Sequence, residues 1–397
     1  MGKAVRKIVT FIVAACLMAG LSGCYDRREL DTLGIVLGVG LDKSETEGET
    51  DVTVQMANPG GASSSKSSKG SKAGEKGTGT EEAYINQTGS GKLINDIIRD
   101  MQHEMSRRIY VAHSQVMVIG EDLAKSGLRD SLDFFLRAPE ARMTLYVFVA
   151  KGRAQEILST KPEFEKITST ELSKMLKDQK ITSEAPIITE FDFVESICSK
   201  TTAAYAPLVR LDENNGKKRL TVEGCAVFDQ SRMVGELNAV ETRGLLFATG
   251  KTQTGVIPVS VEGVSSTIEI KEASSNVTPT LYTDGTAAFN IDIKTLIGIG
   301  DQTGTLTLSD EKTFAPVLAA TAEAIKGEIL SAVEKSKELD ADIFGFGEML
   351  YRKYPKQWEK LKDNWKNAYK NITVTVSVNA KADGSGRIGK PLAPEGN

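Results

Sequence analysis

Hydrophobic and polar positions alternate along this chain with two different periods, and each change of period marks a change of element. Residues 51–57 alternate, with Val52, Val54 and Met56 on one side, which predicts a half-buried strand. From residue 92 the spacing becomes helical, and one apolar face is made of Leu93, Ile94, Ile97, Ile98, Met101 and Met105. Strand and helix patterns therefore follow one another closely in the first part of the chain.

The first half continues in this mixed pattern up to about residue 151, and helices follow up to residue 177. Short apolar runs predict strands at 33–41, 51–57, 83–87, 116–119 and 143–150. Amphipathic stretches predict helices at 121–125, 128–137, 155–158 and 163–177. We expect Pro186, Pro207 and the polar turn at 212–218 to break the chain. Strands that alternate with helices indicate a mixed α/β layer.

Strand patterns dominate the second half, which ends in helices and one more strand. Strands are predicted at 220–228, 233–237, 256–261, 265–271, 286–299 and 371–378, and an amphipathic helix at 311–339. The inward side of that helix is predicted to carry Phe314, Val317, Leu318, Thr321, Ile325, Ile329 and Val333. An aromatic stripe of Trp358, Trp365 and Tyr369 follows, and it is either core or a ligand-stacking surface.

These patterns predict a multi-domain α+β fold. Its N-terminal part is a mixed α/β domain at 24–200, followed by a small middle domain at 201–255. The last domain, 256–390, is an antiparallel sheet packed by long helices. Residues 59–80 consist mainly of Gly, Ser and Lys, so we expect a flexible loop inside the first domain, between two strands of a hairpin. A basic tether to anionic lipid is the alternative for this loop.

The N-terminus has the order of regions found in a secretory signal peptide, which predicts that residues 1–23 are removed. Lys3, Arg6 and Lys7 precede an apolar run of 14 residues at 8–21, shorter than the roughly 20 that cross a bilayer. Leu-Ser-Gly-Cys at 21–24 resembles a lipobox, which predicts cleavage before Cys24 and acylation of that residue. The alternatives are an ordinary signal with a chance cysteine and an uncleaved anchor.

Composition and motifs argue against several classes of function. Removal of the three cationic residues in the signal peptide shifts the formal net charge from −4 to −7, and no basic stripe with interleaved aromatics supports nucleic-acid binding. Cys198 and Cys225 remain after processing, and they are either paired or buried separately. His103 and His113 lack an obvious third metal ligand. No nucleophile, phosphate-loop or dinucleotide motif is present, so we expect no enzyme, no metal and no cofactor.

Several blocks of sequence resemble the Ger(x)C spore germination proteins, the C subunits of nutrient germinant receptors. The blocks occur in the family's order: residues 24–30 (CYDRREL), 33–42 (LGIVLGVGLD), 108–113 (RIYVAH), 116–123 (VMVIGEDL), 132–137 (LDFFLR), 146–152 (YVFVAKG) and 342–348 (DIFGFGE), then Pro355, Trp358 and Trp365. Two departures from the family are Tyr25, where a tryptophan is usual, and the long polar segment at 59–80.

The resemblance implies a non-enzymatic lipoprotein of three α+β domains, anchored through Cys24 on the outer face of the spore inner membrane. It implies partnership with an A-type subunit and a polytopic B-type subunit during nutrient-triggered germination. Phe344 and Phe346 are candidates for a partner interface, and the alternative is that they pin a helix connection. The competing function class is a solute-binding lipoprotein of a transporter, in which two similar α/β lobes would enclose a cleft.

Overall fold

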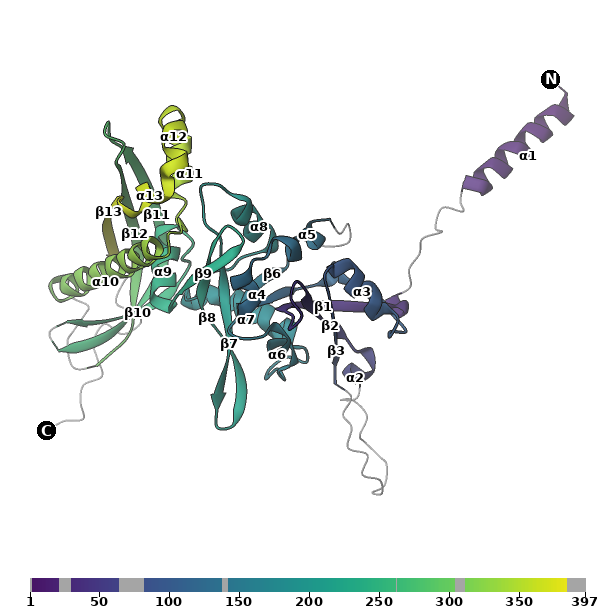
Figure 1. Cartoon of the computed structure of the whole chain (residues 1–397), viewed down its shortest axis with the longest axis horizontal. Coiled ribbons are helices and arrows are strands. Elements are labelled where there is room, and N and C mark those ends of the chain that lie inside the picture. The colour runs from purple at the N-terminus through teal and green to yellow at the C-terminus, as the bar shows by residue number, and fades with distance from the viewer. Residues whose placement is uncertain are drawn as a thin grey trace, which may run out of the picture.

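The protein is elongated and contains two β-sheets along its length (Figure 1). The computed structural model describes residues 2–20, 30–63, 82–137, 142–261, 263–303 and 311–383. Helix α1 (Lys3–Gly20) belongs to the predicted signal peptide and is drawn apart from both sheets (Figure 1). Within the described residues, none of the helices is long and apolar enough to cross a membrane.

The first sheet has nine strands and a parallel centre. Its order is β3-β2-β1-β5-β6-β7-β8-β9, with β4 beside β1. The pairs β1–β5, β5–β6, β6–β7 and β1–β4 are parallel, and the outer pairs are antiparallel. The strands are β1 (Leu33–Lys43), β2 (Thr50–Ala57), β3 (Tyr84–Gly91), β4 (Arg108–Tyr110), β5 (Val116–Gly120), β6 (Tyr146–Ala150), β7 (Tyr205–Asn214), β8 (Lys217–Asp229) and β9 (Arg232–Leu237).

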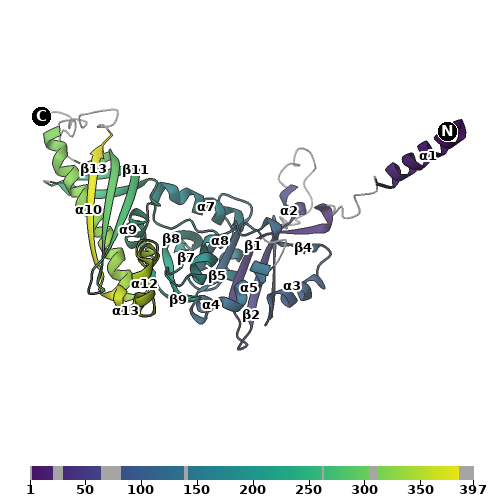
Figure 2. The ribbon, with the colours of Figure 1, turned by 90° about the horizontal axis from the view of Figure 1, so that it is seen from above.

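Helices cover both faces of this sheet, which explains the uninterrupted apolar runs of its central strands. Met117 and Ile119 of β5 point into one core, with α4 (Glu121–Ser126), α5 (Arg129–Arg137) and α8 (Glu190–Cys198). Val116 and Val118 point to the other face, where they pack with α6 (Ala154–Ser159) and α7 (Thr168–Thr182). Figure 2 shows α7 on one side of the sheet and α4 and α5 on the other.

The predicted hairpin around the low-complexity segment is confirmed by strand pairing. β2 and β3 are antiparallel neighbours whose register runs from Thr50 opposite Gly91 to Ala57 opposite Tyr84. Residues 59–63 form a short helix, α2 (Pro59–Ser63), and residues 64–80 lie outside the described residues. After β3, the amphipathic pattern from residue 92 forms α3 (Ile94–Gln102), and the 3-10 helix η2 (Val111–His113) precedes β5.

The strands of the segment 201–255, which the sequence predicts to be a small middle domain, belong to the nine-stranded sheet. β7, β8 and β9 continue the nine-stranded sheet, and α9 (Ala239–Ala248) follows them. Pro207 was expected to break the chain, yet it lies within β7. The register with β8 shifts between Pro207 and Val209, and such an irregularity accommodates a residue that cannot donate to the ladder. The predicted domain boundaries stay predictions.

The second sheet has four strands in the order β10-β11-β12-β13. β10 (Gly255–Val261), β11 (Val264–Leu281) and β12 (Ala287–Gln302) form an antiparallel meander, as predicted. β13 (Thr373–Ala382) pairs with β12 in parallel, which differs from the predicted all-antiparallel sheet. The helices between β12 and β13 make this possible, since a parallel neighbour requires a long crossover connection.

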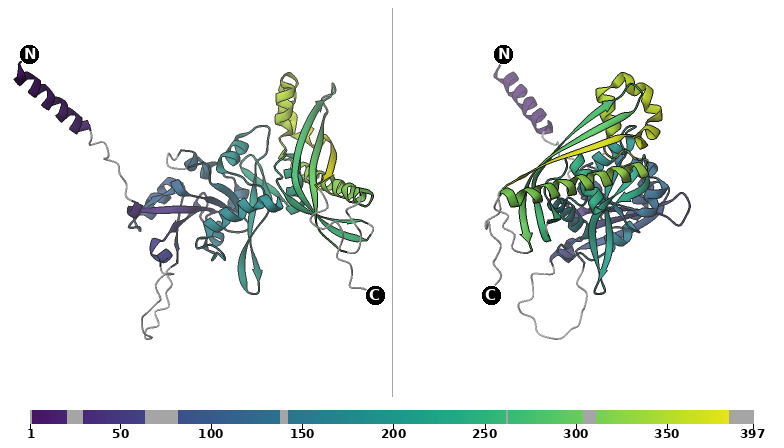
Figure 3. Two further views of the ribbon diagram at one scale, coloured as in Figure 1. Left: turned by 180° about the vertical axis from the view of Figure 1, so that it is seen from behind. Right: turned by 90° about the vertical axis from the view of Figure 1, so that its left-hand side faces the viewer.

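Helix α10 (Glu311–Glu338) runs across one face of the second sheet (Figure 3). Six of its seven predicted inward residues are buried, and Leu318 is partly buried beside them. Three short helices follow, joined by a 3-10 turn, before the chain reaches β13: α11 (Phe346–Lys353), α12 (Pro355–Leu361), η3 (Lys362–Asn364) and α13 (Trp365–Lys370).

Candidate functional site

The predicted lipidation residue, Cys24, falls outside the described residues, so its acylation stays a prediction. The described chain resumes with a 3-10 turn, η1 (Leu30–Thr32), that leads directly into β1. Leu33, the first residue of β1, follows Cys24 by nine positions. An extended connection of that length spans at most about 30 Å, so acylation of Cys24 would hold the first sheet close to the membrane.

Phe344 and Phe346 lie in the interior of the second half. Phe346 is fully buried and Phe344 is 4% exposed. The Phe346 ring stacks on Phe289 of β12, with 4.1 Å between ring centroids, and on Phe344, with 5.1 Å. Burial leaves neither ring exposed on the surface, which disfavours a partner interface, and that role stays a prediction. Their positions fit the alternative, in which the two rings pin the connection between α10 and α11.

Asp342, the first residue of the same sequence block, organises the start of α11. Its carboxylate accepts hydrogen bonds from the backbone N–H groups of Phe346 at 3.0 Å and Gly347 at 2.7 Å, and from the indole N–H of Trp365 at 3.3 Å. Burial raises the pKa of Asp342 to about 6, although these donors favour the charged form. One carboxylate thereby joins a helix N-terminus to an aromatic residue of α13.

This block also attaches the second half of the protein, which is the four-stranded sheet with its helices, to the first half, which contains the nine-stranded sheet. The backbone N–H of Ala203 donates to the Asp342 carbonyl at 2.8 Å, and the Thr201 hydroxyl donates to Glu348 at 3.0 Å. A Cβ on Gly347 would lie 2.7 Å from the Trp365 indole nitrogen and 3.0 Å from the Thr201 carbonyl. A larger residue here would displace the Trp365 indole and crowd the Thr201 carbonyl, so the block 342–348 is a junction element.

The aromatic stripe is core, and it is not a ligand-stacking surface. Trp358, Trp365 and Tyr369 are each at most 6% exposed. The two indole rings meet edge to face with centroids 5.4 Å apart, and the Tyr369 hydroxyl contacts Ser336 of α10. These rings therefore hold α12 and α13 against the long helix.

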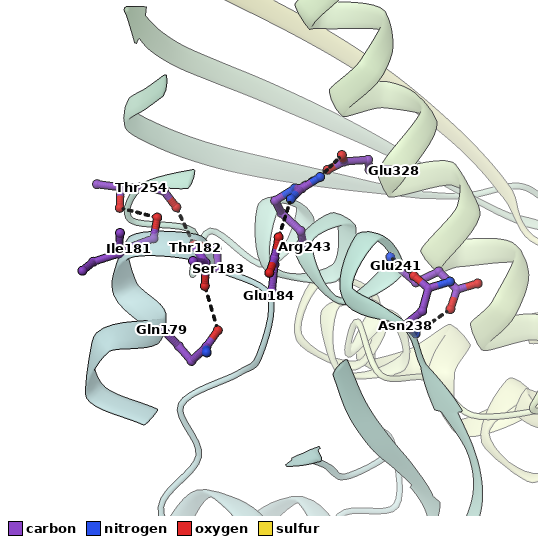
Figure 4. Close-up of polar contacts among 10 residues, drawn as sticks. All are labelled: Gln179, Ile181, Thr182, Ser183, Glu184, Asn238, Glu241, Arg243, Thr254 and Glu328. Atoms are coloured by element: carbon purple, nitrogen blue, oxygen red, sulfur yellow. Dashed lines mark hydrogen bonds and ion pairs between the residues drawn. The ribbon is translucent and has the colours of Figure 1, made fainter. Parts of the chain in front are cut away.

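A buried ion cluster forms a second junction between the two halves. The guanidinium of Arg243, in α9, donates to both carboxylate oxygens of Glu328 in α10, and one of these distances is 2.9 Å. Its third nitrogen donates to Glu184 at 3.2 Å (Figure 4). Arg243 and Glu328 are 5% and 8% exposed, and the neighbouring carboxylates raise the pKa of Arg243 despite the opposing cost of burial. The cluster therefore links the segment after α7 to α9 and α10.

Two close backbone approaches tighten this junction. A Cβ on Gly244 would lie 2.1 Å from the Glu328 carbonyl oxygen, so α9 and α10 touch through their main chains there. Ser183, at the end of α7, donates its hydroxyl to the Thr254 carbonyl at 2.6 Å, and the Thr254 hydroxyl donates back to the Ile181 carbonyl at 3.1 Å (Figure 4). The residue that precedes β10 is thus tied to the end of α7.

Sequence reasoning missed this ion cluster. Arg243, Glu328 and Glu184 are far apart in the chain and match no motif. A local signal did exist for α9, because Asn238 and Glu241 form a reciprocal capping box that marks the helix start (Figure 4). Arg243 lies in this helix just before the apolar run Leu-Leu-Phe-Ala at 245–248. Its neighbours indicate that the helix is buried, and a buried charge needs a partner.

A cleft of about 760 Å³ lies beside Asp342, between the helices of the first half and η3 with α13. Its rim carries charges of both signs: Arg129, Lys200, Lys362, Lys366, Asp133, Asp229, Asp340 and Asp363. Lys366 bonds Asp229 across the junction at 2.5 Å. This mixture of charges defines no single ligand chemistry.

The remaining candidate residues form no reactive site within the described part of the chain. His103 and His113 are exposed, and the described residues contain no group of three metal-ligating side chains. Cys198 is exposed and Cys225 is buried, and both are free thiols. Burial raises the pKa of Cys225 to about 12, which keeps that thiol protonated.

Known proteins resemble this chain in both fold and sequence. A solved structure, described as the crystal structure of the GerBC protein, matches with a TM-score of 0.55 at 19% identity, covering 90% of this chain and 100% of that one. The match shows a shared fold. Two family models match consecutive parts of the sequence: the spore germination protein N-terminal domain at residues 26–211, and the spore germination B3/GerAC-like C-terminal domain at 223–386.

Curated relatives extend over nearly the whole chain. Spore germination protein KC of Bacillus subtilis (strain 168) is 28% identical over 387 residues, 92% of each chain. Spore germination protein B3 of the same organism is 22% identical and covers 96% of this chain and 98% of its own length. Spore germination protein A3 is 22% identical over 90% of this chain. The chain belongs to the Ger(x)C family of spore germination proteins.

Proposed function

We propose that this protein is a non-enzymatic, lipid-anchored subunit of a nutrient germinant receptor required for spore germination. It is held by acylated Cys24 on the outer face of the spore inner membrane and acts with an A-type and a polytopic B-type membrane subunit. The observation that carries the proposal is the pair of family models, which match in order along the chain and begin two residues after Cys24. The lipobox resemblance supports the anchor.

The structure supports a scaffold role through the two junctions. The block 342–348 and the Arg243 cluster both connect the first sheet to the second half through buried contacts. A subunit of this kind presents a fixed arrangement of surfaces to other proteins. Its exposed residues, and not the buried family block, would then contact the membrane subunits.

The central test is genetic and biochemical. Spores that lack the gene should lose germination in response to one class of nutrient and regain it on complementation. The tagged chain should copurify with two membrane proteins encoded beside it. Normal germination with every nutrient tested, together with recovery of the chain alone, would refute the proposal.

The anchor has a separate test with a matched control. We expect Cys24→Ala to abolish incorporation of radiolabelled lipid and to release the protein from membranes, whereas Cys198→Ala, at an exposed free thiol, should leave both unchanged. Membrane retention of the unacylated Cys24→Ala protein at the normal level would show that contacts with partner subunits suffice for attachment.

The competing proposal is a solute-binding lipoprotein of a transporter. It predicts two similar α/β lobes, whereas this chain combines a nine-stranded sheet with a four-stranded one. The neighbouring genes separate the two proposals. Genes for two germinant-receptor membrane subunits are expected, and genes for a permease with an ATPase would favour the transporter.

A further inference from the structure

The loop between α6 and α7, residues 160–167, carries an exposed phenylalanine at its tip. The Phe164 side chain is 91% exposed, the largest fraction among the large hydrophobic side chains that the structure describes. A single exposed apolar residue is common on protein surfaces and is no site by itself. The way this loop is held, and the charges around it, distinguish Phe164 from the other exposed apolar residues.

Glu171 of α7 holds the loop from inside. Its side chain is buried, and its carboxylate accepts hydrogen bonds from three successive backbone N–H groups: Glu163 at 3.2 Å, Phe164 at 3.0 Å and Glu165 at 3.1 Å. Hydrogen bonds to a charged acceptor are stronger than those between neutral groups. The tip is therefore fixed before any contact forms, and a surface that binds it loses little free energy in ordering the loop.

Both ends of the loop are attached to strands beside the one that follows the predicted anchor. Asn86 of β3 donates to the Ser159 hydroxyl at 3.2 Å, and Gln55 of β2 accepts from the backbone N–H of Ser169 at 2.8 Å. β2 pairs in turn with β1, the first strand after Cys24. The loop is thus fixed to the part of the protein that acylation of Cys24 would hold near the membrane.

The tip of the β7–β8 hairpin adds positive charge beside the loop. The Arg219 guanidinium lies 2.8 Å from a carboxylate oxygen of Glu163, so residues 213–219 lie next to residues 161–166. Together the two segments carry five cations and three acids, a net charge of +2 in a chain whose net charge is −4. The cations are Lys161, Lys166, Lys217, Lys218 and Arg219, and all five are exposed.

The two acids that flank the ring are ion-paired. Glu163 pairs with Arg219, and Glu165 pairs with Lys174 of α7. An adjacent cation reduces the repulsion between each carboxylate and an anionic surface. Phe164 therefore projects from surroundings that carry net positive charge, although its sequence neighbours are acids.

From this arrangement we propose that Phe164 is a second membrane contact, whose ring inserts into the headgroup region of an anionic bilayer while the neighbouring cations face the lipid phosphates. Apolar insertion combined with attraction to anionic lipid is the general mode of interfacial binding. This inference deepens the proposed function, because it rests on attachment of the chain to the membrane at residue 24.

The contact defines which face of the first sheet points toward the bilayer. The face covered by α6 and α7 is the near one, and α8 covers the opposite face. Figure 1 shows α6 and the tip of the β7–β8 hairpin on the lower side of the first sheet, and α8 on the upper side. Phe191 of α8 is 56% exposed, so it provides a matched aromatic position on the far face.

Quenching of tryptophan fluorescence by brominated lipid tests this orientation. The chain from residue 25 onward is attached through an N-terminal histidine tag to vesicles of phosphatidylglycerol, brominated phosphatidylcholine and a nickel-chelating lipid. The tag replaces the acyl group, so the test does not depend on lipidation. Helix α1, which is left out with the signal peptide, is drawn apart from both sheets (Figure 1).

The unaltered chain gives the background in this assay, because Trp358 and Trp365 are buried. We expect brominated lipid to quench the emission that Phe164→Trp adds, and to leave the emission that Phe191→Trp adds unchanged. Absence of quenching for Phe164→Trp would refute the proposal, and so would equal quenching of both variants, since the chain would then have no fixed near face.

Vesicle affinity measures the strength of the contact. In the tagged chain the tag and Phe164 bind the same vesicle, so both contribute to the dissociation constant. Phe164→Ser should weaken vesicle binding by about tenfold, whereas Phe191→Ser should leave it unchanged. Replacing phosphatidylglycerol by phosphatidylcholine should also weaken binding, and equal affinity for both compositions would exclude a role for the cations.

A protein contact is the remaining outcome. If Phe164→Ser leaves vesicle affinity unchanged but reduces copurification with the membrane subunits, the ring binds protein and the lipid assignment is wrong. Failure of the proposed function itself would show in the gene deletion and in lipid labelling of Cys24. Neither of those measurements uses the tagged chain, so the two failures are distinguishable.

Discussion

The buried pair Arg243–Glu328 gives the sharpest prediction about how the two halves hold together. Replacing Arg243 by Met removes the cation and keeps an unbranched side chain in α9. The Glu328 carboxylate, 8% exposed, is then left in the interior without its cationic partner. We expect a loss of about 3–5 kcal/mol in the free energy of unfolding, the usual cost when one member of a buried pair is removed.

The reciprocal change should cost less. Glu328→Gln leaves Arg243 with Glu184, whose side chain is 38% exposed and lies 3.2 Å from the guanidinium. The double variant Arg243→Met with Glu328→Leu removes both buried charges and restores apolar packing between α9 and α10. It should fall within about 1–2 kcal/mol of the unaltered protein, because well-packed apolar replacements of buried ion pairs are often neutral.

The chain offers a convenient optical assay for this cycle. It has two tryptophans, Trp358 and Trp365, and both are buried in the helices of the second half. Urea unfolding followed by tryptophan fluorescence reports that half, and far-ultraviolet circular dichroism reports the whole chain. If the cluster couples the two halves, Arg243→Met should give different unfolding midpoints by fluorescence and by circular dichroism, whereas the unaltered chain should give the same midpoint by both.

A surface pair on the same helix provides the control. Lys326 and Glu323 form an exposed ion pair in α10, so Lys326→Met should change stability by at most about 0.5 kcal/mol. Two results would refute the reasoning: a loss below about 1 kcal/mol for Arg243→Met, or a double variant as unstable as the sum of the single changes, since the cycle would then show no coupling.

Three further predictions follow from burial and strand pairing. Replacing residues 64–81 by a short Gly-Ser turn should change stability by at most about 1 kcal/mol, since loop entropy grows only logarithmically with length; a failure to fold would contradict the loop assignment. Phe346→Ala should cost about 3–5 kcal/mol in urea unfolding, and a loss below about 1 kcal/mol would contradict its burial. Burial without a partner raises the pKa of Glu190 from 4.5 to about 7, so folding binds a proton and stability falls as pH rises between these values. Glu190→Gln should therefore be up to about 3 kcal/mol more stable than the unaltered chain at pH 8 but not at pH 4, and an equal effect at both pH values would exclude this titration.

Elements with strong local periodicity were predictable from the sequence. The central strands β5 and β6 are continuous apolar runs, and α10 repeats its apolar positions over many turns. In the two strands nearly every residue is buried, and in the helix the buried residues recur every three or four positions. Local pattern and tertiary environment agree there, so the pattern suffices.

Sheet membership was not predictable in the same way. β7 contains Pro207, which locally argues against a strand, and its pairing with β6 is limited to Leu208 and Val209. The parallel placement of β13 depends on where the preceding helices return the chain. Both features depend on contacts between distant segments, so no local pattern reveals them.

The family block 342–348 shows why a recognisable motif can leave two interpretations open. Two aromatic residues among glycines fit either a partner-facing loop or a pin for the helix connection when only neighbouring residues are considered. The requirement for glycine at 347 arises from the Thr201 carbonyl and the Trp365 indole, which meet there only in the folded chain. Asp342 likewise looks like a surface acid until its backbone and indole donors converge on it. Since these contacts lie inside the protein, the block reports how the two halves are joined, and a search for partner contacts must begin with exposed residues around it.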